Sequence, residues 1–307
     1  MKKGYIFIIL TALFYSTQEI SGKFLASKGK MDPFQVMFIV FFIGAIILFP
    51  LAIKDIKSKN IEIDFNDLIY IGICGVLSAT ISMSMLQFAV TYTQASTSAV
   101  LFCTNSIFTV PFAYFILKEK VKKTTLISMA ISLVGVVIIF QPAKVISGMN
   151  SSRDFIGILF AFGAAIVWSL YTVLSKKKIN KYGGYVFNFI AFSFGVLALL
   201  LILIFTNRPI FHGVTTNNII VLLYMGIFIK AIGYICYLGA VKETSAVTAS
   251  TVFLIKPALA TILSVVVLSE KIALSTIVGI VFIVLGSYIN FSSNKKENVN
   301  NEKTVKV

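Results

Sequence analysis

The stretch that decides the fold is Thr244–Lys271, TSAVTASTVFLIKPALATILSVVVLSEK. It is long and apolar enough to cross a membrane as one helix, yet Lys256 and Pro257 lie near its middle. A lysine at the bilayer midplane costs roughly 3 kcal/mol on insertion scales, so it should face a partner or a wet cavity. The proline frees a backbone carbonyl that must find a donor inside the bundle. A charge and a helix irregularity at one depth predict a binding site.

The rest of the chain has the composition of a polytopic membrane protein. Of its 307 residues, 58% are hydrophobic and 13% charged, and the mean hydropathy is +0.93. The net charge of +15 does not indicate a nucleic-acid partner, because the lysines lie in short loops between apolar runs, where they set membrane orientation. Cys74, Cys103 and Cys236 fall inside apolar runs without metal-ligand spacing, so we expect small buried side chains and no structural disulfide.

Ten apolar runs have the length of a membrane span, which predicts an all-α fold of ten transmembrane helices. The first run is too long for a signal peptide and lacks a small-residue cleavage site, so we interpret it as a span. We expect the polar tail 292–307 to be disordered and cytoplasmic. In chain order, spans 1 to 10 are expected at 4–27, 33–53, 66–90, 95–117, 124–142, 155–178, 184–206, 217–241, 245–268 and 272–291.

The distribution of basic residues predicts the orientation. With the N-terminus in the cytoplasm, 18 of the 27 lysine and arginine residues lie on the inner side and 6 in outer loops. The remaining three, Lys23, Lys230 and Lys256, lie within spans. Both termini are therefore expected to be cytoplasmic. The lysine- and isoleucine-rich composition is typical of an AT-rich bacterial genome, which favours a multi-pass protein of the bacterial cytoplasmic (inner) membrane.

The two halves of the chain are related to each other. One alignment sets Thr11–Lys23 on Ala164–Lys176, and a second sets Thr93–Lys120 on Thr244–Lys271. Each half has five spans, and an odd number forces the second half to enter the membrane from the opposite side. We therefore predict two inverted five-helix repeats, 1–142 and 143–291, an arrangement typical of secondary transporters. The matched positions are Tyr15-Ser16 with Trp168-Ser169, Lys23 with Lys176, Gly75 with Gly226, Ala95 with Ala246, and Glu119-Lys120 with Glu270-Lys271.

These features together resemble the drug/metabolite transporter superfamily, in its ten-span EamA-type branch. The resemblance rests on the duplication, on the aromatic-Ser pair in spans 1 and 6, and on the Glu-Lys pair that ends spans 4 and 9. It implies a central cavity lined mainly by spans 1, 3, 4, 6, 8 and 9, with alternating access that needs no ATP. The chain departs from the pattern in two places. In span 4, Ser106 stands at the position equivalent to Pro257, and the proline comes five residues later, at Pro111. In span 9, Pro257 stands where phosphate-translocating relatives have arginine, so the resemblance does not imply a phosphate substrate.

Three ionisable residues lie deep within spans. Lys256 is either a cation for an anionic substrate group or a structural lysine held by a fixed acid. Glu19 either pairs with Lys23 one turn further along, serves as counter-ion to a deep lysine, or couples transport to protons. With both deep lysines and Glu19 ionised, the site carries one net positive charge. That balance favours an anion, or a zwitterion whose amine lies near Glu19.

Lys230 shares a helix face with Tyr234 and Tyr237 in span 8. It either contacts substrate or is stabilised by a cation–π interaction with a ring. Other polar and aromatic side chains inside spans complete the predicted substrate site, although each could instead serve packing or an interhelical hydrogen bond. These further candidates are Tyr15, Trp168, Tyr171, Asn105 and Gln87.

The sequence contains no P-loop, no GxSxG and no HExxH, and His212, the sole histidine, lies in an outer loop. We therefore predict no catalytic residue, no metal site and no cofactor, and a protein that is not an enzyme. The predicted partners are a small-molecule substrate and the lipid bilayer, with no nucleic acid. Coupling to protons or another ion and a homodimer are left open.

The predicted function is a secondary transporter of small organic metabolites, with amino acids or organic carboxylates favoured. One alternative is an exporter of cationic or drug-like amines that uses Glu19 as the binding group. An alternative of another class is a channel or a non-transporting membrane scaffold.

Overall fold

The computed structural model describes residues 2–119, 121–140, 152–256, 258–259, 274, 277–286 and 288–289. All regular elements in these ranges are helices, as expected for an all-α membrane protein. In the first half they are α1 (Lys2–Tyr15), α2 (Gln18–Ser27), α3 (Pro33–Lys59), α4 (Phe65–Gly75), the π-helical η1 (Val76–Ser82), α5 (Met83–Tyr92), α6 (Ala95–Cys103), α7 (Asn105–Phe112), the π-helical η2 (Ala113–Leu117) and α8 (Lys123–Phe140).

The second half begins with α10 (Ser152–Phe205), which turns sharply at Gly183 and forms two antiparallel arms. Gly183 has a φ of 73°, a left-handed conformation that favours glycine. The arms correspond to spans 6 and 7. The further elements are α11 (Thr216–Tyr224), the π-helical η3 (Met225–Gly233), α12 (Tyr234–Glu243), α13 (Ala246–Ser250) and the helical segment 277–286.

The helices have the length and polarity of membrane spans. Five continuous helical stretches are long and apolar enough to cross a bilayer, and every one of the ten predicted spans overlaps described helix. The predicted tail, the repeat boundary at 142/143 and, apart from 258–259, the second half of span 9 lie outside the described residues. The five stretches are Pro33–Lys59, Phe65–Tyr92, Thr97–Leu117, Arg153–Phe205 and Thr216–Glu243.

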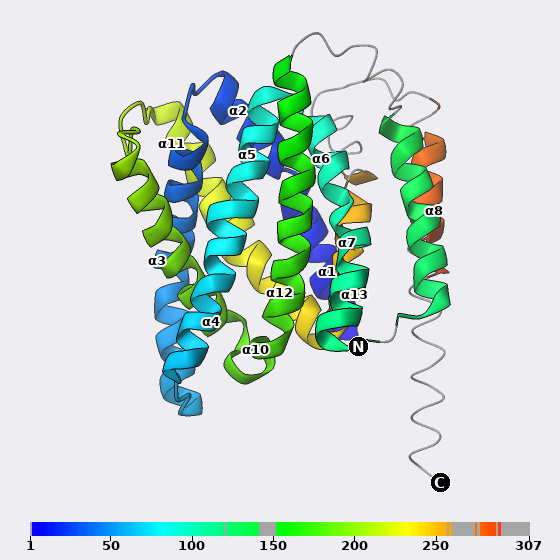
Figure 1. Cartoon of the computed structure of the whole chain (residues 1–307), viewed down its shortest axis with the longest axis horizontal. Coiled ribbons are helices and arrows are strands. Elements are labelled where there is room, and N and C mark those ends of the chain that lie inside the picture. Colours follow the sequence, from blue (N-terminus) through cyan, green and yellow to red (C-terminus); the bar gives the residue numbers. More distant parts are fainter. Residues whose placement is uncertain are drawn as a thin grey trace.

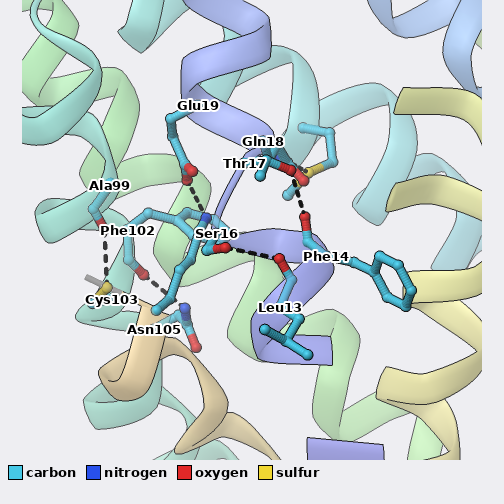
Figure 2. Close-up of polar contacts among 12 residues, drawn as sticks. Leu13, Phe14, Ser16, Thr17, Gln18, Glu19, Ala99, Phe102, Cys103 and Asn105 are labelled. Carbon is cyan, nitrogen blue, oxygen red and sulfur yellow. Dashed lines mark hydrogen bonds and ion pairs between the residues drawn. The ribbon is translucent and has the colours of Figure 1, made fainter. Parts of the chain in front are cut away.

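Several predicted spans are interrupted near their middle. Between α1 and α2 the hydroxyls of Ser16 and Thr17 donate to the carbonyls of Leu13 and Phe14, at 2.7 and 2.9 Å (Figure 2). The break before α7 and the break after α13 show the same contact, made by Thr104 and Thr251. Side chains that bond carbonyls one turn back satisfy backbone groups at an irregularity inside the bilayer. Each of these three spans can therefore bend at its break without leaving an unpaired backbone carbonyl in lipid.

The halves use the same contacts at equivalent positions. A Cβ atom on Gly75 would lie 1.9 Å from the Ala191 carbonyl oxygen, and one on Gly226 would lie 3.2 Å from the Val40 carbonyl oxygen. Gly226 and Ala191 each lie 151 residues after their counterpart in the first half. Gly75 lies directly before the π-helical η1, and Gly226 lies within the π-helical η3. Spans 3 and 8 thus cross a helix of the opposite half by close backbone contact.

The bundle has two ends, which we name for the description that follows. The N-terminal end holds the start of α1, the Gly183 turn and the start of α13; the far end holds α2 and the start of α11 (Figure 1). Helix α8 packs against the segment 277–286 at one side of the bundle, where a Cβ atom on Gly135 would meet the Gly279 carbonyl at 2.5 Å. The other helices surround the interior in which the candidate site lies.

Candidate functional site

An ion pair joins the two halves inside the bundle. Lys256 donates from Nζ to Glu19 Oε1, although the two residues are only 1% and 3% exposed. Glu19 lies in the first turn of α2, just after the break at Ser16 and Thr17. Its second oxygen, Oε2, is buried and has no hydrogen-bond partner among the described residues. The pair cancels two buried charges and leaves one carboxylate oxygen free to accept a further hydrogen bond.

Lys230, in η3, is the second deep lysine, and its side chain is fully buried. Nζ donates to Gln18 Oε1 at 3.3 Å and lies 4.8 Å above the Phe41 ring and 5.5 Å above the Tyr234 ring. No carboxylate within the described part of the chain forms an ion pair with it. Cation–π contacts and one amide oxygen stabilise an ammonium less than a carboxylate would in a water-poor interior.

The three charges influence one another. Lys230 is repelled electrostatically by Lys256 and attracted by Glu19, and Gln18, the neighbour of Glu19, contacts Lys230 directly. The group carries one net positive charge when all three are ionised. Its electrostatics therefore suit a ligand that brings one negative charge.

Aromatic side chains from several spans pack next to these charges. Trp168 touches the most rings of this group, with centroid distances of 5.1 Å to Tyr171, 5.3 Å to Tyr234 and 5.4 Å to Tyr237. The hydroxyl of Tyr237 bonds the Thr172 hydroxyl at 2.6 Å. The hydroxyls of three other tyrosines are buried and have no partner in the part of the chain that the structure describes. We call the whole group the central aromatic cluster; it comprises Tyr15, Phe102, Trp168, Tyr171, Tyr234, Tyr237 and Phe253, with free hydroxyls on Tyr15, Tyr171 and Tyr234.

Free hydroxyls in a buried aromatic wall are uncommon, because a buried polar group without a partner costs free energy. Here they occur on spans 1, 6 and 8, beside a lysine and a carboxylate oxygen that also have bonding capacity to spare. The arrangement offers a small molecule both hydrogen bonds and apolar contact area, which is the usual composition of a ligand site.

The structure brings most of the predicted site residues together. Lys256, Lys230, Glu19 and the predicted aromatic residues lie in or beside the central aromatic cluster. Asn105 lies next to Phe102, to whose carbonyl its amide donates at 2.7 Å, and its Oδ1 has no partner (Figure 2). Gln87 lies apart, where it donates to the Gly22 carbonyl at 3.0 Å and ties α5 to α2.

One geometric alternative is decided. Glu19 is the counter-ion of Lys256, not a helix partner of Lys23, since Lys23 donates instead to the Thr93 carbonyl. Glu19 and Lys23 both lie in the continuous helix α2, so it is the contact of each with a more distant partner, and not a break in the helix, that replaces the i, i+4 pair. Lys230 Nζ lies 5.5 Å from the centroid of the Tyr234 ring, and its contact with a substrate stays a prediction.

The sequence did not identify Phe41, the ring closest to Lys230. It lies in an uninterrupted apolar run, where no polar neighbour or periodicity distinguishes one phenylalanine from another. Gln18 was recognisable as a polar residue within a span, but only the tertiary structure shows that it contacts Lys230.

Paired intramembrane charges at broken helices, within a fold of two related halves, define a multi-pass membrane transporter. The EamA-like transporter family model matches residues 2–141 and 155–292, so the chain belongs to this family. The chain is thus a transporter of the drug/metabolite superfamily, as the sequence features indicated.

The similarity to two relatives extends over nearly the whole chain. An uncharacterized transporter of Clostridium kluyveri is 71% identical over 298 residues, covering 97% of this chain and 96% of the relative. An uncharacterized transporter of Archaeoglobus fulgidus is 22% identical, covering 94% and 96%. A solved crystal structure matches with a TM-score of 0.76 and 16% identity, covering 96% of this chain and 99% of that one. At this identity the likeness shows the fold alone.

Proposed function

We propose that the protein carries small organic metabolites with a carboxylate group, such as amino acids or organic carboxylates, across the bacterial cytoplasmic membrane by alternating access. One observation carries the proposal. Lys230 is a fully buried lysine with which no described carboxylate forms an ion pair, whereas the neighbouring Lys256 and Glu19 pair with each other. A substrate carboxylate would supply the missing negative charge, in a place where an ion pair forms without competition from water.

The surrounding groups would orient the substrate. The free hydroxyls of Tyr15, Tyr171 and Tyr234 can donate to substrate oxygens, and Glu19 Oε2 can accept from a substrate amine. The sequence left Lys256 as either a substrate cation or a lysine held by a fixed acid; because Lys256 is paired with Glu19, we assign the first contact to Lys230 and leave Lys256 as the counter-ion that holds Glu19. Protonation of Glu19 would break this pair, which makes Glu19 the residue for coupling to protons.

The two repeats would rock about the site, so that it faces each side of the membrane in turn. The equivalent crossings at Gly75 and Gly226 support two halves of the same construction. The distribution of basic residues supports cytoplasmic termini, with the N-terminal end of the bundle facing the cytoplasm.

The test is a binding panel on the purified full chain, wild type beside Lys230→Met. Methionine keeps an unbranched apolar side chain and removes only the ammonium. A ligand at a hundred times its Kd raises stability by about 2.7 kcal/mol, so the melting temperature reports binding. We expect an amino acid or carboxylate to stabilise wild type and the control Lys177→Met, an exposed lysine, but not Lys230→Met. Equal stabilisation of all three proteins would overturn the assignment.

A second candidate has its own observation. Glu19 Oε2 is buried and unpaired, so a cationic or drug-like amine could bind there and compete with Lys256. In that case quaternary amines would stabilise wild type and Lys230→Met equally, and Glu19→Gln would abolish the effect. Saturable counterflow in liposomes separates either carrier from a channel or scaffold, because counterflow requires a site that alternates between the two sides.

A further inference from the structure

At each end of the bundle a lysine side chain donates to a backbone carbonyl, and the two contacts use equivalent positions of the two repeats. At the far end Lys23 Nζ donates to the Thr93 carbonyl at 2.8 Å, between α5 and α6. At the N-terminal end Lys176 Nζ donates to the Thr244 carbonyl at 2.9 Å, between α12 and α13. Lys23 aligns with Lys176, and Thr93 aligns with Thr244, in the two repeat alignments of the sequence. We call these contacts the far latch and the N-terminal latch.

The latches lie symmetrically about the candidate site. Tyr15 and Trp168, also equivalent in the two halves, touch edge to face with ring centroids 6.3 Å apart. Each latch lysine follows its aromatic residue by eight residues, which is roughly 12 Å along a helix. One latch therefore holds the end of span 1 over the site from the far side, and the other holds the end of span 6 over it from the N-terminal side.

The two latches are unequal in strength. Lys176 donates not only to Thr244 but also to the carbonyl of Val241 and, at 3.1 Å, to that of Lys242. Lys23 bonds a single carbonyl among the described residues. An ammonium has three hydrogens, so Lys176 uses its full bonding capacity and Lys23 does not.

Acidic residues reinforce the N-terminal latch further. Glu119 and Glu243 both attract Lys176, and Glu119 Oε1 accepts from the Ala246 backbone nitrogen at 3.4 Å. Glu119 thereby ties the end of span 4 to the start of span 9, beside the carbonyls that Lys176 holds. At the far end Asp154 attracts Lys23. Among the described residues the N-terminal latch thus joins the ends of spans 4, 6, 8 and 9, whereas the far latch joins span 1 to the turn between spans 3 and 4; Glu270, the repeat counterpart of Glu119, lies outside those residues.

We infer that Lys23 and Lys176 are opposed latches that decide which side the transport site faces, and that the empty transporter rests closed at its N-terminal end. This inference rests on the proposed alternating access. In such a cycle one latch must break while the other holds, so the weaker far latch breaks first. The empty protein then accepts substrate from the far side, which the basic residues place outside the cell.

The experiment measures the two ends separately in the full chain, in liposomes, without substrate. Spin-label pairs are attached at Ser27 and Gln94 for the far end and at Asn180 and Lys242 for the N-terminal end, all four residues being exposed. Cys74, Cys103 and Cys236 are first replaced by alanine so that only the labelled sites react. Pulsed electron-paramagnetic-resonance distances are then compared among wild type, Lys23→Met and Lys176→Met.

The expected results are opposite for the two variants. Lys176→Met increases the population with a long Asn180–Lys242 distance by roughly tenfold relative to wild type, because it removes a charge-assisted hydrogen-bond set. Lys23→Met increases the population with a long Ser27–Gln94 distance and leaves the N-terminal end closed. Lys176→Arg, which keeps a cationic donor, restores the wild-type distribution. An unchanged N-terminal distance in Lys176→Met, or the same shift in both variants, overturns the inference.

Two further comparisons make the result decisive. If Lys176→Met does not elute as a folded monodisperse protein, Lys176→Gln, which keeps one donor group, is measured with the same labels. The distances need no substrate, so reciprocal shifts with no carboxylate binding would reject the proposed cargo and keep the latches. Carboxylate binding to Lys230 without any shift would reject the latches and keep the proposed cargo.

Discussion

Lys256 and Glu19, separated by 237 positions in the sequence, form an ion pair in the interior of the bundle, and each is almost completely buried. Neither charge is tolerable there alone, because transferring an ion from water into the protein interior costs several kcal/mol. The pair therefore ties span 1 to span 9 through their broken segments. It also distinguishes the two deep lysines, since Lys230 has no such partner among the described residues.

Breaking this pair should be costly unless both charges are removed. We expect Lys256→Met to lower the free energy of unfolding by about 3–5 kcal/mol, because Glu19 remains as an uncompensated buried carboxylate. The double variant Lys256→Met with Glu19→Gln should recover most of the loss. A double-mutant cycle of detergent unfolding measures the coupling. Additive effects of the two substitutions would show that the pair does not stabilise the fold.

Lys230→Met should behave differently from Lys256→Met. Because the ammonium has no counter-ion among the described residues, its replacement by an apolar side chain removes a desolvated charge without leaving another one unpaired. We expect the melting temperature of the empty protein to stay unchanged or to rise. A fall as large as that of Lys256→Met would show that Lys230 has a structural role and would argue against its assignment to substrate.

The close crossing of spans 3 and 7 depends on Gly75. A Cβ atom there would lie 1.9 Å from the Ala191 carbonyl oxygen, a backbone atom that cannot move aside alone. Gly75→Ala should therefore destabilise the fold by about 1–3 kcal/mol or prevent its accumulation. Gly184→Ala is the matched control, since the nearest atom to its Cβ would be 3.9 Å away. Similar melting temperatures for the two variants would contradict the crossing.

Glu119 should make stability depend on pH. Burial raises the pKa of its carboxyl above the usual range, and this exceeds the opposing effects of the Ala246 backbone hydrogen bond and the Lys176 charge. A raised pKa in the folded state means that the unfolded state releases this proton more easily. The contribution of Glu119 to stability is therefore full below the ordinary glutamate pKa and decreases as pH rises through the raised value.

Glu119→Gln keeps the polar side chain but does not titrate. The difference in melting temperature between wild type and Glu119→Gln should consequently shift in favour of the variant as the pH rises from acidic to neutral. Lys123→Gln, an exposed residue at the start of α8, serves as a control whose difference from wild type should stay constant over this range. A constant difference for Glu119→Gln as well would show that its carboxyl is not perturbed.

Much of the architecture could be predicted without coordinates because it depends on local composition. The expected spans overlap helices, since in lipid a helix is the structure that satisfies the backbone within one segment. Gly75 with Gly226 and Lys23 with Lys176 were matched as repeats by sequence, and the structure places each pair in equivalent contacts. The candidate charges were recognisable because ionisable residues within spans are rare and costly.

The sequence by itself determined the class of protein, the family and the identity of the deep charges, because hydropathy, repeats and charge depth are properties of single residues and short segments. Only the tertiary structure decided that Glu19 pairs with Lys256, that Phe41 lies over Lys230, and that Gln87 bonds the Gly22 carbonyl away from the site. These pairings depend on where a helix breaks and on how helices rotate about their axes. A break at Ser16 and Thr17 redirects every following side chain of span 1, and no local pattern fixes that rotation.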